Sequence, residues 1–381
     1  MARLIVVEDL AGPAVLGRGG HAMHVFQILE GLRRLGHDVL FLEYLDEPPS
    51  AEAVRSFTSL VAGWWDPRGA ALLDARTGAS LAGISRAAVR SFAAGAEALL
   101  SLAAHYRADP WPLLEHVRPR ILLEQDPGYT HVWAAEGDSA SIFGVHDICF
   151  TVGANVGTGR SAIPTAGMRW HPLWPPVVLD WWTPAKPVTV DRFTTIGAWR
   201  DYGYFEFEGR MLGPKVDEFE GFLDLPSRAG ESLELVLAID DDDPDRDRLL
   251  EHGWLLRDPG LVATPAAYRD YVSGSRGEFS CAKGGYVGTR SGWFSDRSAC
   301  YLAAGRPVVL QATGFEDVLP TGAGVIAVDS ADEAADAIAE VRRDHGRHAA
   351  AARAIAEEYF DAERLLGEAL ELAGVARGRR V

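Results

Sequence analysis

Short apolar runs alternate with helical patterns from the first residues of the chain onward. Residues 4–7 form an uninterrupted apolar run, which is typical of a parallel strand buried on both faces. In residues 21–35 the apolar side chains recur at helical spacing, Gly36 can end that helix, and residues 39–44 form a second apolar run. The order strand, loop, helix, strand predicts a parallel sheet with a right-handed crossover.

The rest of the first half continues the pattern less regularly. Residues 50–118 are rich in alanine, with helical patterns near 51–62 and 84–106, and we expect them to form the helical cover of the sheet. Residues 120–124 and 142–152 contain further strands. Because residues 168–187 are rich in proline and tryptophan, no helix can pass through them, and we predict a connection packed on the core.

A second α/β unit is predicted from about residue 193. The elements that we expect there are strands near 233–239, 254–256, 278–281, 308–310 and 325–328, and helices near 215–223, 264–272, 296–304, 330–343 and 348–372.

The stretch 278–315 carries the clearest candidate chemistry. A Gly-rich loop leads into a helix that Ser295 or Asp296 can cap, and Gly305 can end that helix. A loop that runs into a helix start presents free amides and the positive end of the helix dipole, which suits a phosphate. Lys283, Arg290 and Arg297 add positive charge to the stretch. Any strand–loop–helix connection needs glycines, so the loop alone leaves phosphate binding and a purely structural role equally open.

Composition narrows the possible partners. The chain has 381 residues, enough for two domains, and a formal net charge of −17, which argues against nucleic acid or an anionic membrane. A small anionic ligand needs only a local cationic pocket. Three cysteines without a CxxC spacing indicate reduced thiols and therefore a cytoplasmic location. The apolar run at the N-terminus is too short for a signal peptide, and we expect no later apolar run to be long enough to span a bilayer.

Two further motifs have ordinary explanations. Gly17, Gly19 and Ala22 follow the GxGxxA spacing of a dinucleotide site, with Glu43 as the ribose ligand, but a long loop separates Gly17 from the first strand. The run of four aspartates at 240–243 could hold a metal ion. A helix start at Asp243-Pro244 explains it better, and we expect no metal site.

Short strings in the second half resemble one enzyme family. LAAGRPVV at 302–309 is similar to the turn of GT-B glycosyltransferases in which a helix points its N-terminus at the diphosphate of a nucleotide sugar, and TRSGWFSDR at 289–297 resembles bacterial members. The resemblance implies two Rossmann-like α/β domains facing each other across a cleft. We expect an acceptor domain at 1–187, a nucleotide-sugar domain at 188–355, and a C-terminal helix at 356–381 that packs back on the first domain.

The resemblance also implies donor-binding residues. Arg200 at the end of IGAWR and Lys215 match the basic residues that face the diphosphate. Cys300 stands where many relatives have the glutamate that binds ribose, so Glu278 and Asp296 are the substitutes we would test. The remaining donor candidates, some of which would supply backbone amides, are Gly20, Lys283, Ser291, Gly292, Trp293, Phe294, Ser295 and Asp296.

For catalysis the resemblance implies a histidine base. His21 stands where inverting relatives have the base, and Asp126 could orient its ring. His24 and His146 are the competitors, and His146 matches the position of a histidine that meets the donor sugar in retaining relatives. Trp170 and Trp174 are the candidates for an aromatic wall beside the acceptor.

The expected function is metal-independent transfer of a hexose, glucose in the first instance, from a UDP-sugar to a hydroxyl of a small molecule such as a nucleoside or polyketide, with inversion. No cofactor besides the donor and no membrane span is expected, and a homodimer is possible. A nucleotide-sugar 2-epimerase of the same fold and an NAD-dependent oxidoreductase are the alternatives.

Overall fold

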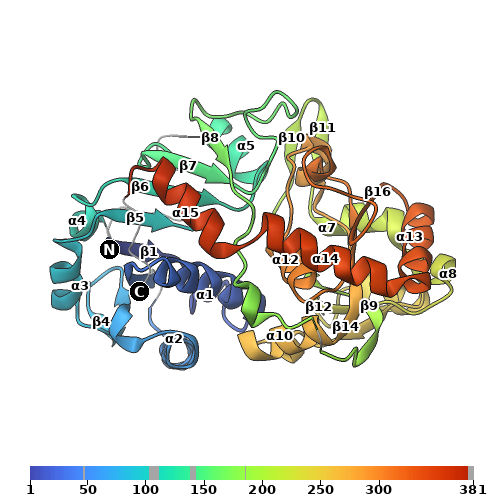
Figure 1. The fold of residues 1–381 in the computed structure, drawn as a ribbon, viewed down its shortest axis with the longest axis horizontal. Coiled ribbons are helices and arrows are strands. Elements are labelled where there is room, and N and C mark those ends of the chain that lie inside the picture. The colour runs from blue at the N-terminus through green and yellow to red at the C-terminus, as the bar shows by residue number, and fades with distance from the viewer. Residues whose placement is uncertain (46–47, 103–110, 138–142, 185, 376–381) are drawn as a thin grey trace.

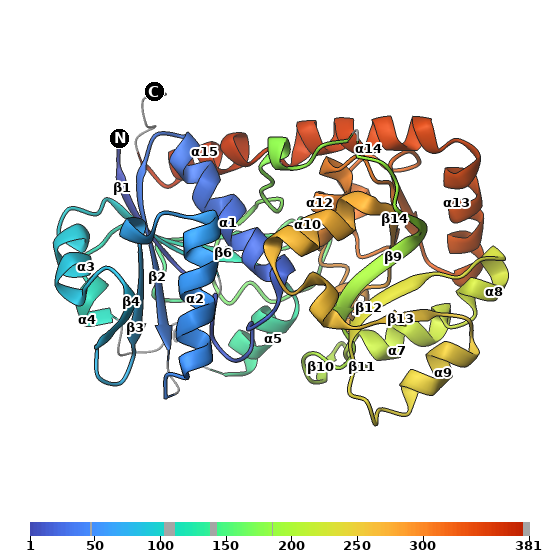
Figure 2. The same ribbon diagram turned by 90° about the horizontal axis from the view of Figure 1, so that it is seen from below.

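The computed structural model describes residues 1–45, 48–102, 111–137, 143–184 and 186–375. They form two α/β lobes that lie side by side, the first half of the chain in one and most of the second half in the other (Figure 1). Each lobe has its own sheet with helices on both faces (Figure 2). The predicted two-domain α/β architecture is therefore confirmed.

The first sheet is parallel except at one edge, and its order is β4-β3-β2-β1-β5-β6-β7-β8. Among the strands that the structure describes in this sheet, β4 alone runs antiparallel, against β3. The apolar run at the N-terminus forms β1, which pairs with β2 and β5 in the middle of the sheet and is buried, as predicted. The strands are β1 (Arg3–Val7), β2 (Asp38–Leu45), β3 (Ala70–Asp74), β4 (Ser80–Gly83), β5 (Ala98–Ser101), β6 (Arg120–Glu124), β7 (Ile148–Thr151) and β8 (Trp170–Pro172).

The first lobe's helices include the predicted amphipathic helix after β1. This helix, α1, begins two residues earlier than predicted and is buried on all sides over residues 22–32, because α10 and α15 also pack on it. Within the described part of residues 1–175 the helices are α1 (Gly19–Arg34), α2 (Ala51–Trp64), α3 (Arg86–Ala93), α4 (Trp111–Leu114) and α5 (Tyr129–Glu136), with a 3-10 turn η1 (Pro67–Gly69).

The second sheet is entirely parallel, with the order β13-β12-β9-β14-β15-β16. A separate hairpin, β10–β11, lies beside α5 of the first lobe. The strands are β9 (Val190–Ala198), β10 (Phe205–Phe207), β11 (Arg210–Leu212), β12 (Glu234–Ala238), β13 (Leu255–Arg257), β14 (Ser275–Ser280), β15 (Val308–Gln311) and β16 (Val325–Val328).

Helices surround this second sheet at most of the predicted places. They are α7 (Lys215–Phe219), α8 (Leu225–Ala229), α9 (Asp245–Glu251), α10 (Pro265–Gly274), α11 (Gly284–Thr289), α12 (Asp296–Ala303) and α13 (Ala331–Arg343), with 3-10 turns η2 (Leu179–Trp181), η3 (Glu220–Phe222), η4 (Pro259–Val262) and η5 (Phe315–Asp317).

The predicted single helix at 348–372 is wrong, because two helices occupy this region. These are α14 (His345–Tyr359) on the second lobe and α15 (Ala362–Leu372), which lies against α1 in the first lobe (Figure 1). The break has a specific cause. Val177 of the inter-lobe connection donates its amide to the carbonyl of Phe360 at 2.7 Å and accepts from the amide of Ala362 at 3.0 Å. Asp361 then caps α15.

Two other predictions are corrected. A helix was predicted over residues 84–106, but only its first part is helical, as α3, and residues 98–101 form the strand β5. Residues 103–106 of this prediction lie outside the described part of the chain. Residues 98–101 are buried on both faces, and periodicity cannot distinguish such a short run from a helix. Residues 70–83, predicted as helical cover, form β3 and β4.

The Gly-rich segment after β14 is also not a plain loop, since residues 284–289 form α11. Its glycines permit close packing: a Cβ at Gly285 would lie 2.4 Å from the ring of Tyr129, and one at Gly288 would lie 2.4 Å from Leu212. Tertiary contacts, not phosphate binding, explain these two glycines.

Candidate functional site

A cavity of about 340 Å³ lies between the two lobes. Its walls come from the carboxyl ends of strands in both sheets and from the starts of α1 and α12, the place where open α/β sheets bind ligands. The first lobe contributes Gly17, Arg18, Gly19, Gly20, His21, His24, Gln125 and Asp126; the second contributes Ile196, Gly197, Ala198, Asp201, Lys215, Val236, Ala238, Pro259, Val262, Tyr268, Lys283, Tyr286, Trp293, Ser295, Asp296 and Arg297.

Lys215 is the most unusual cavity residue. It starts α7, is only 8% exposed, and has no hydrogen bond or ion pair to any other described residue. Burial, together with the positive charges of Arg297 and Lys283, lowers the pKa of Lys215 to about 8. A buried ammonium without a counter-ion is costly, so this position favours an anionic ligand.

Arg297 lies on the same wall, but its side chain is already bound. Its Nε donates to Glu278 at 2.5 Å, and its other two nitrogens donate to the carbonyl of Ile196 and the hydroxyl of Ser280, each at 2.7 Å. The fixed guanidinium adds positive potential to the wall without being free to move toward a ligand.

Two helix N-termini face the cavity from opposite lobes. The α12 start is capped by Ser295, whose hydroxyl accepts from the amide of Arg297 at 3.2 Å. The α1 start has no side-chain cap. It begins with glycines because a Cβ at Gly19 would lie 2.2 Å from the carbonyl of Val262 in the other lobe. Both dipoles therefore direct positive potential at the space beside Lys215.

His21, at the start of α1, is held in one tautomer. Its Nε2 lies 2.6 Å from the carbonyl oxygen of Asp9. A carbonyl only accepts, so Nε2 carries the proton and Nδ1 keeps the lone pair. Burial lowers the pKa of His21, and the ring is therefore neutral at pH 7, as a base must be.

Asp126 was predicted to orient His21, and the structure places it with other partners. Its carboxylate accepts from Tyr202 at 2.7 Å and from Tyr286 at 2.5 Å, and it lies 3.8 Å from the ammonium of Lys283. That ammonium lies 3.5 Å from the centre of the Tyr202 ring. Asp126 thus organises an aromatic and cationic group on the cavity wall, while a backbone carbonyl holds His21.

His24 lies one turn after His21 and also lines the cavity. The side chain is buried, and neither ring nitrogen has a hydrogen-bond partner among the described residues. Burial lowers the pKa of His24, so this ring is neutral as well. His146 is not among the cavity residues, and burial lowers the pKa of its ring to about 4.

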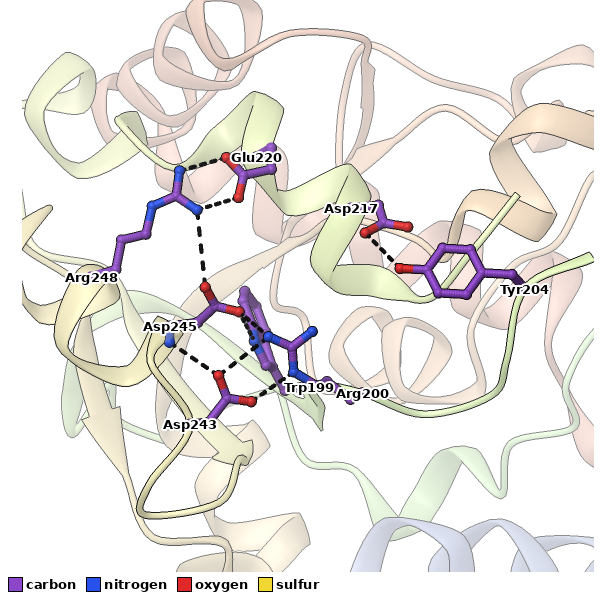
Figure 3. Close-up of polar contacts among 8 residues, drawn as sticks. All are labelled: Trp199, Arg200, Tyr204, Asp217, Glu220, Asp243, Asp245 and Arg248. Carbon is purple, nitrogen blue, oxygen red and sulfur yellow. Dashed lines mark hydrogen bonds and ion pairs between the residues drawn. The ribbon is translucent and has the colours of Figure 1, made fainter. Parts of the chain in front are cut away.

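Arg200 is not brought to the cavity. Its guanidinium donates to Asp243 at 2.7 Å and to Asp245 at 2.5 Å, on the outer side of the loop after β9 (Figure 3). Trp199 donates to the same Asp245 at 2.9 Å, so the pair anchors this loop to the start of α9. Asp243 also accepts from the amide of Asp245 at 3.0 Å, which agrees with the helix-start interpretation of the aspartate run.

Glu278 and Cys300 are likewise placed away from a ligand. Glu278 is fully buried and holds Arg297, so its carboxylate is not available to ribose. Cys300 is buried, and its sulfur contacts the side-chain amide of Gln27 at 3.6 Å. Asp296 is the predicted ribose candidate that does line the cavity.

The amides expected from Ser291 and Gly292 are used inside the protein. The Gly292 amide donates to Thr313 at 2.8 Å, and the Ser291 amide donates to Tyr286 at 3.3 Å. Their carbonyls accept from Ala154 and Asn155 of the first lobe. We call this contact between residues 153–161 and 288–293 the inter-lobe clasp. Ser291 and Gly292 belong to it and do not line the cavity. Phe294 does not line the cavity either and packs against Phe315 and Phe360.

The two predicted acceptor tryptophans have packing roles. Trp170 is buried against His131 and Phe143, with ring centres 4.5 and 4.9 Å away. Trp174 packs on Phe294 and Phe360 at the junction of the lobes and borders a small separate cavity with His24.

Some of the predicted site residues line the cavity, together with residues that were not predicted. Gly20, His21, Asp126, Lys215, Lys283, Trp293, Ser295 and Asp296 line one cavity. Sequence reasoning assigned no site role to Arg18, Gln125, Asp201 or Tyr268. The TRSGWFSDR string contains Arg297, which was noted only for its charge. Glu43, the candidate of the dinucleotide motif, is fully buried and does not line the cavity.

Within the described residues no group of three metal-ligating side chains lies close enough together to hold an ion. The same part of the chain contains no helix with the length and hydropathy of a membrane span. Cys149, Cys281 and Cys300 are all buried free thiols.

Comparison with known proteins gives structural matches only. No protein-family model and no curated protein sequence matches the chain. Among solved structures, Anabaena HepE in complex with UDP and glucose matches 98% of this chain and 100% of its own at a TM-score of 0.61 and 12% identity.

Two further structures match to a similar extent. An alpha-glucosyltransferase in complex with UDP and DNA has a TM-score of 0.58 at 11% identity and covers 98% of this chain and 100% of its own. AviGT4, a glycosyltransferase of avilamycin A biosynthesis, has a TM-score of 0.53 at 13% identity and covers 99% of each chain. With two facing Rossmann-like lobes, an inter-lobe cavity and a crossing C-terminal helix, the chain has the GT-B fold of the nucleotide-sugar glycosyltransferases.

Proposed function

We propose that this protein is a glycosyltransferase that moves a hexose from a UDP-sugar to a hydroxyl of a small molecule. The observation that carries the proposal is Lys215, a buried lysine without a partner among the described residues, on the wall of an inter-lobe cavity. The two helix starts beside it favour the same kind of ligand, a diphosphate. HepE and the alpha-glucosyltransferase share the fold and were solved with UDP, which supports a uridine donor.

In this proposal the lobes divide the work. Residues 188–355 hold the donor, with Lys215 and the α12 start on the diphosphate and Asp296 on the ribose hydroxyls. Residues 1–187 hold the acceptor, and the C-terminal segment from 356 packs back on them. The chain leaves α14 at Tyr359 and enters α15 at Ala362, so the crossing itself falls shortly after residue 356.

The reaction follows from the positions of the charges. The acceptor oxygen attacks C1 of the hexose, the bond from C1 to the diphosphate oxygen breaks, and the electron pair stays on the diphosphate. Lys215 and the helix dipoles stabilise the charge that develops there. Nδ1 of His21 takes the acceptor proton, since Nε2 is already protonated toward Asp9. A direct attack of this kind inverts the anomeric carbon.

Glucose as the sugar, and a nucleoside or polyketide as the acceptor, are the first substrates to test. AviGT4 acts in the biosynthesis of a natural product and has this fold, which motivates that choice. The aromatic residues that line the cavity, Tyr268, Tyr286 and Trp293, suit a flat acceptor better than an extended chain.

The test is calorimetric titration of the full chain with UDP, UDP-glucose, UMP and NAD, followed by a coupled assay of UDP release with an acceptor library. UDP should bind at least tenfold more tightly than UMP, because the second phosphate meets Lys215. Tighter binding of NAD would favour the oxidoreductase alternative. Conversion of a UDP-sugar without any acceptor would favour the epimerase.

A further inference from the structure

The carboxyl group of Glu43 is hydrogen-bonded to the backbone of the loop after β1. Glu43 is fully buried near the end of β2, and its Oε1 accepts from the amide of Ala11 at 2.8 Å. The amides of the neighbouring Leu10 and Gly12 also lower the pKa of the carboxyl. The hydrogen bond from Ala11 thus ties the loop after β1 to one buried side chain of β2.

The same loop holds the proposed base. Asp9, two residues before Ala11, gives its carbonyl oxygen to Nε2 of His21 at 2.6 Å. The amide of Asp9 donates to the side chain of Glu8 at 2.9 Å. Leu10 and Ala11 are buried in the first lobe's core. The carbonyl that selects the tautomer of His21 thus belongs to a short segment that Glu43 holds through the Ala11 amide.

We propose that Glu43 is a positioning residue for His21: its carboxyl fixes the loop 9–12, and the fixed Asp9 carbonyl keeps the imidazole in the Nε2-protonated form with Nδ1 as the proton acceptor. Its catalytic part rests on the proposed function. Its structural part, the control of the tautomer, does not.

The chemistry of the site indicates which substitution should preserve this role. Burial raises the pKa of Glu43 to about 8, so near pH 7 the carboxyl is mostly neutral. Its second oxygen has no hydrogen-bond partner among the described residues. A glutamine offers the same carbonyl oxygen to Ala11 on a side chain of the same length. A leucine fills the space but leaves the Ala11 amide without an acceptor.

The matched control is Leu42→Ala on the same strand. Leu42 precedes Glu43 and is buried in the core on the opposite face of the sheet, with Leu40 and Leu73. This substitution removes core packing and destabilises the lobe without touching the loop. It separates a general loss of stability from a specific effect on His21.

The experiment is ¹⁵N NMR of histidine-labelled full-length protein, with the His21 signals identified by their absence in His21→Gln. Wild type, Glu43→Gln and Leu42→Ala should show a single Nε2-protonated tautomer of His21. Glu43→Leu should show a mixture with the Nδ1-protonated form. A single unchanged tautomer in folded Glu43→Leu, or the same mixture in Leu42→Ala, would overturn the proposal.

Kinetics supply the second arm. In Glu43→Leu the kcat for transfer should fall roughly 10-fold to 100-fold while the Kd for UDP is unchanged, and Glu43→Gln should restore it. If wild type shows the expected tautomers but transfers no sugar, the proposed function fails and the structural inference stands. If transfer occurs but the tautomer does not depend on Glu43, only the inference fails.

Discussion

The carboxylate of Glu278 accepts from the Nε of Arg297 at 2.5 Å, and this buried pair leaves Lys215 as the cavity cation that lacks a partner among the described residues. Arg297 has its remaining nitrogens on the Ile196 carbonyl and the Ser280 hydroxyl. A buried charge whose hydrogen bonds are all made within the protein contributes only a fixed electrostatic potential. A buried charge without a partner is stabilised most when an anionic ligand binds beside it. The predictions on the donor therefore concern Lys215.

Lys215→Met should weaken UDP binding by about 10-fold to 100-fold, because a charge-assisted hydrogen bond contributes about 1.5–3 kcal/mol. The free protein should at the same time unfold at a higher temperature, since a buried unpaired charge has been removed. Thermal unfolding with and without UDP measures both effects. Lys186→Met is the control, because Lys186 is exposed and paired with Asp270. Equal UDP affinity in wild type and Lys215→Met would contradict the assignment.

UDP binding should be linked to proton uptake through Lys215. Burial lowers the pKa of Lys215 to about 8 in the free protein, and a bound diphosphate raises it again. Below pH 8 the lysine is charged in both states, so affinity does not change there. As the pH rises above 8, the free protein loses the proton first and affinity falls. Titrations at pH 8.5 in buffers of different ionisation enthalpy should detect proton uptake in wild type and none from this site in Lys215→Met.

The inter-lobe clasp should stabilise the closed arrangement of the two lobes. Asn155 is fully buried, and its Nδ2 donates to the carbonyls of Arg290 at 3.1 Å and Gly314 at 3.0 Å. Asn155→Ala leaves these carbonyls without that donor and should lower the free energy of unfolding by about 2 kcal/mol in urea. Thr158→Val, which removes a bond within the same loop, is the control. Equal free energies of unfolding of the two variants would show that the Asn155 hydrogen bonds of the clasp do not stabilise the protein.

Sequence reasoning succeeded where a local pattern determines the structure and failed where distant residues do. The β1–α1–β2 unit, the start of α12 and the family turn at 302–309 are local, and the predicted elements lie there. The family resemblance singled out Lys215, and the structure places it on the cavity wall. By contrast, Arg200 does not line the cavity, because its guanidinium is bound by Asp243 and Asp245. These two residues lie more than forty residues later in the chain.

The partner of His21 could not be found from the sequence for a different reason. A backbone carbonyl holds His21, and every residue carries such a group, so residue type gives no signal at position 9. Asp126 had the expected residue type, but Tyr202 and Tyr286 occupy it. The run 98–101 forms β5 between β1 and β6 and is buried on both faces, and a one-dimensional pattern does not show this pairing.

Removal of divalent metal should leave activity unchanged. Asp243 is engaged by Arg200 and by the amide of Asp245 at the start of α9, and a metal ion would have to displace both. In the proposed reaction Lys215 and the helix starts stabilise the leaving diphosphate instead. Transfer assays with EDTA, and with magnesium added back, measure this. A full loss that magnesium reverses would show that the aspartate run, or the donor's phosphates, need a metal ion.

His21→Gln should reduce kcat by roughly two to four orders of magnitude with an unchanged Kd for UDP, because it removes the proton acceptor and leaves the donor wall intact. Burial lowers the pKa of His21 below its ordinary value of 6.5, so the ring is deprotonated and active above that pH. The rate of wild type should therefore stay level near pH 7 and fall only as the pH drops through the lowered pKa. This acidic limb of the pH profile should disappear in His21→Gln.

Asp126→Asn should reduce the rate less than His21→Gln and leave the acidic limb in place, because Asp126 contacts Tyr202, Tyr286 and Lys283 rather than the imidazole. His24→Gln distinguishes the two neutral rings of the cavity: a larger loss of kcat in this variant than in His21→Gln would transfer the role of base to His24. Proton NMR of the product completes the test, since attack assisted by His21 gives a β-linked product from an α-linked donor, and an α-linked product would contradict the whole assignment.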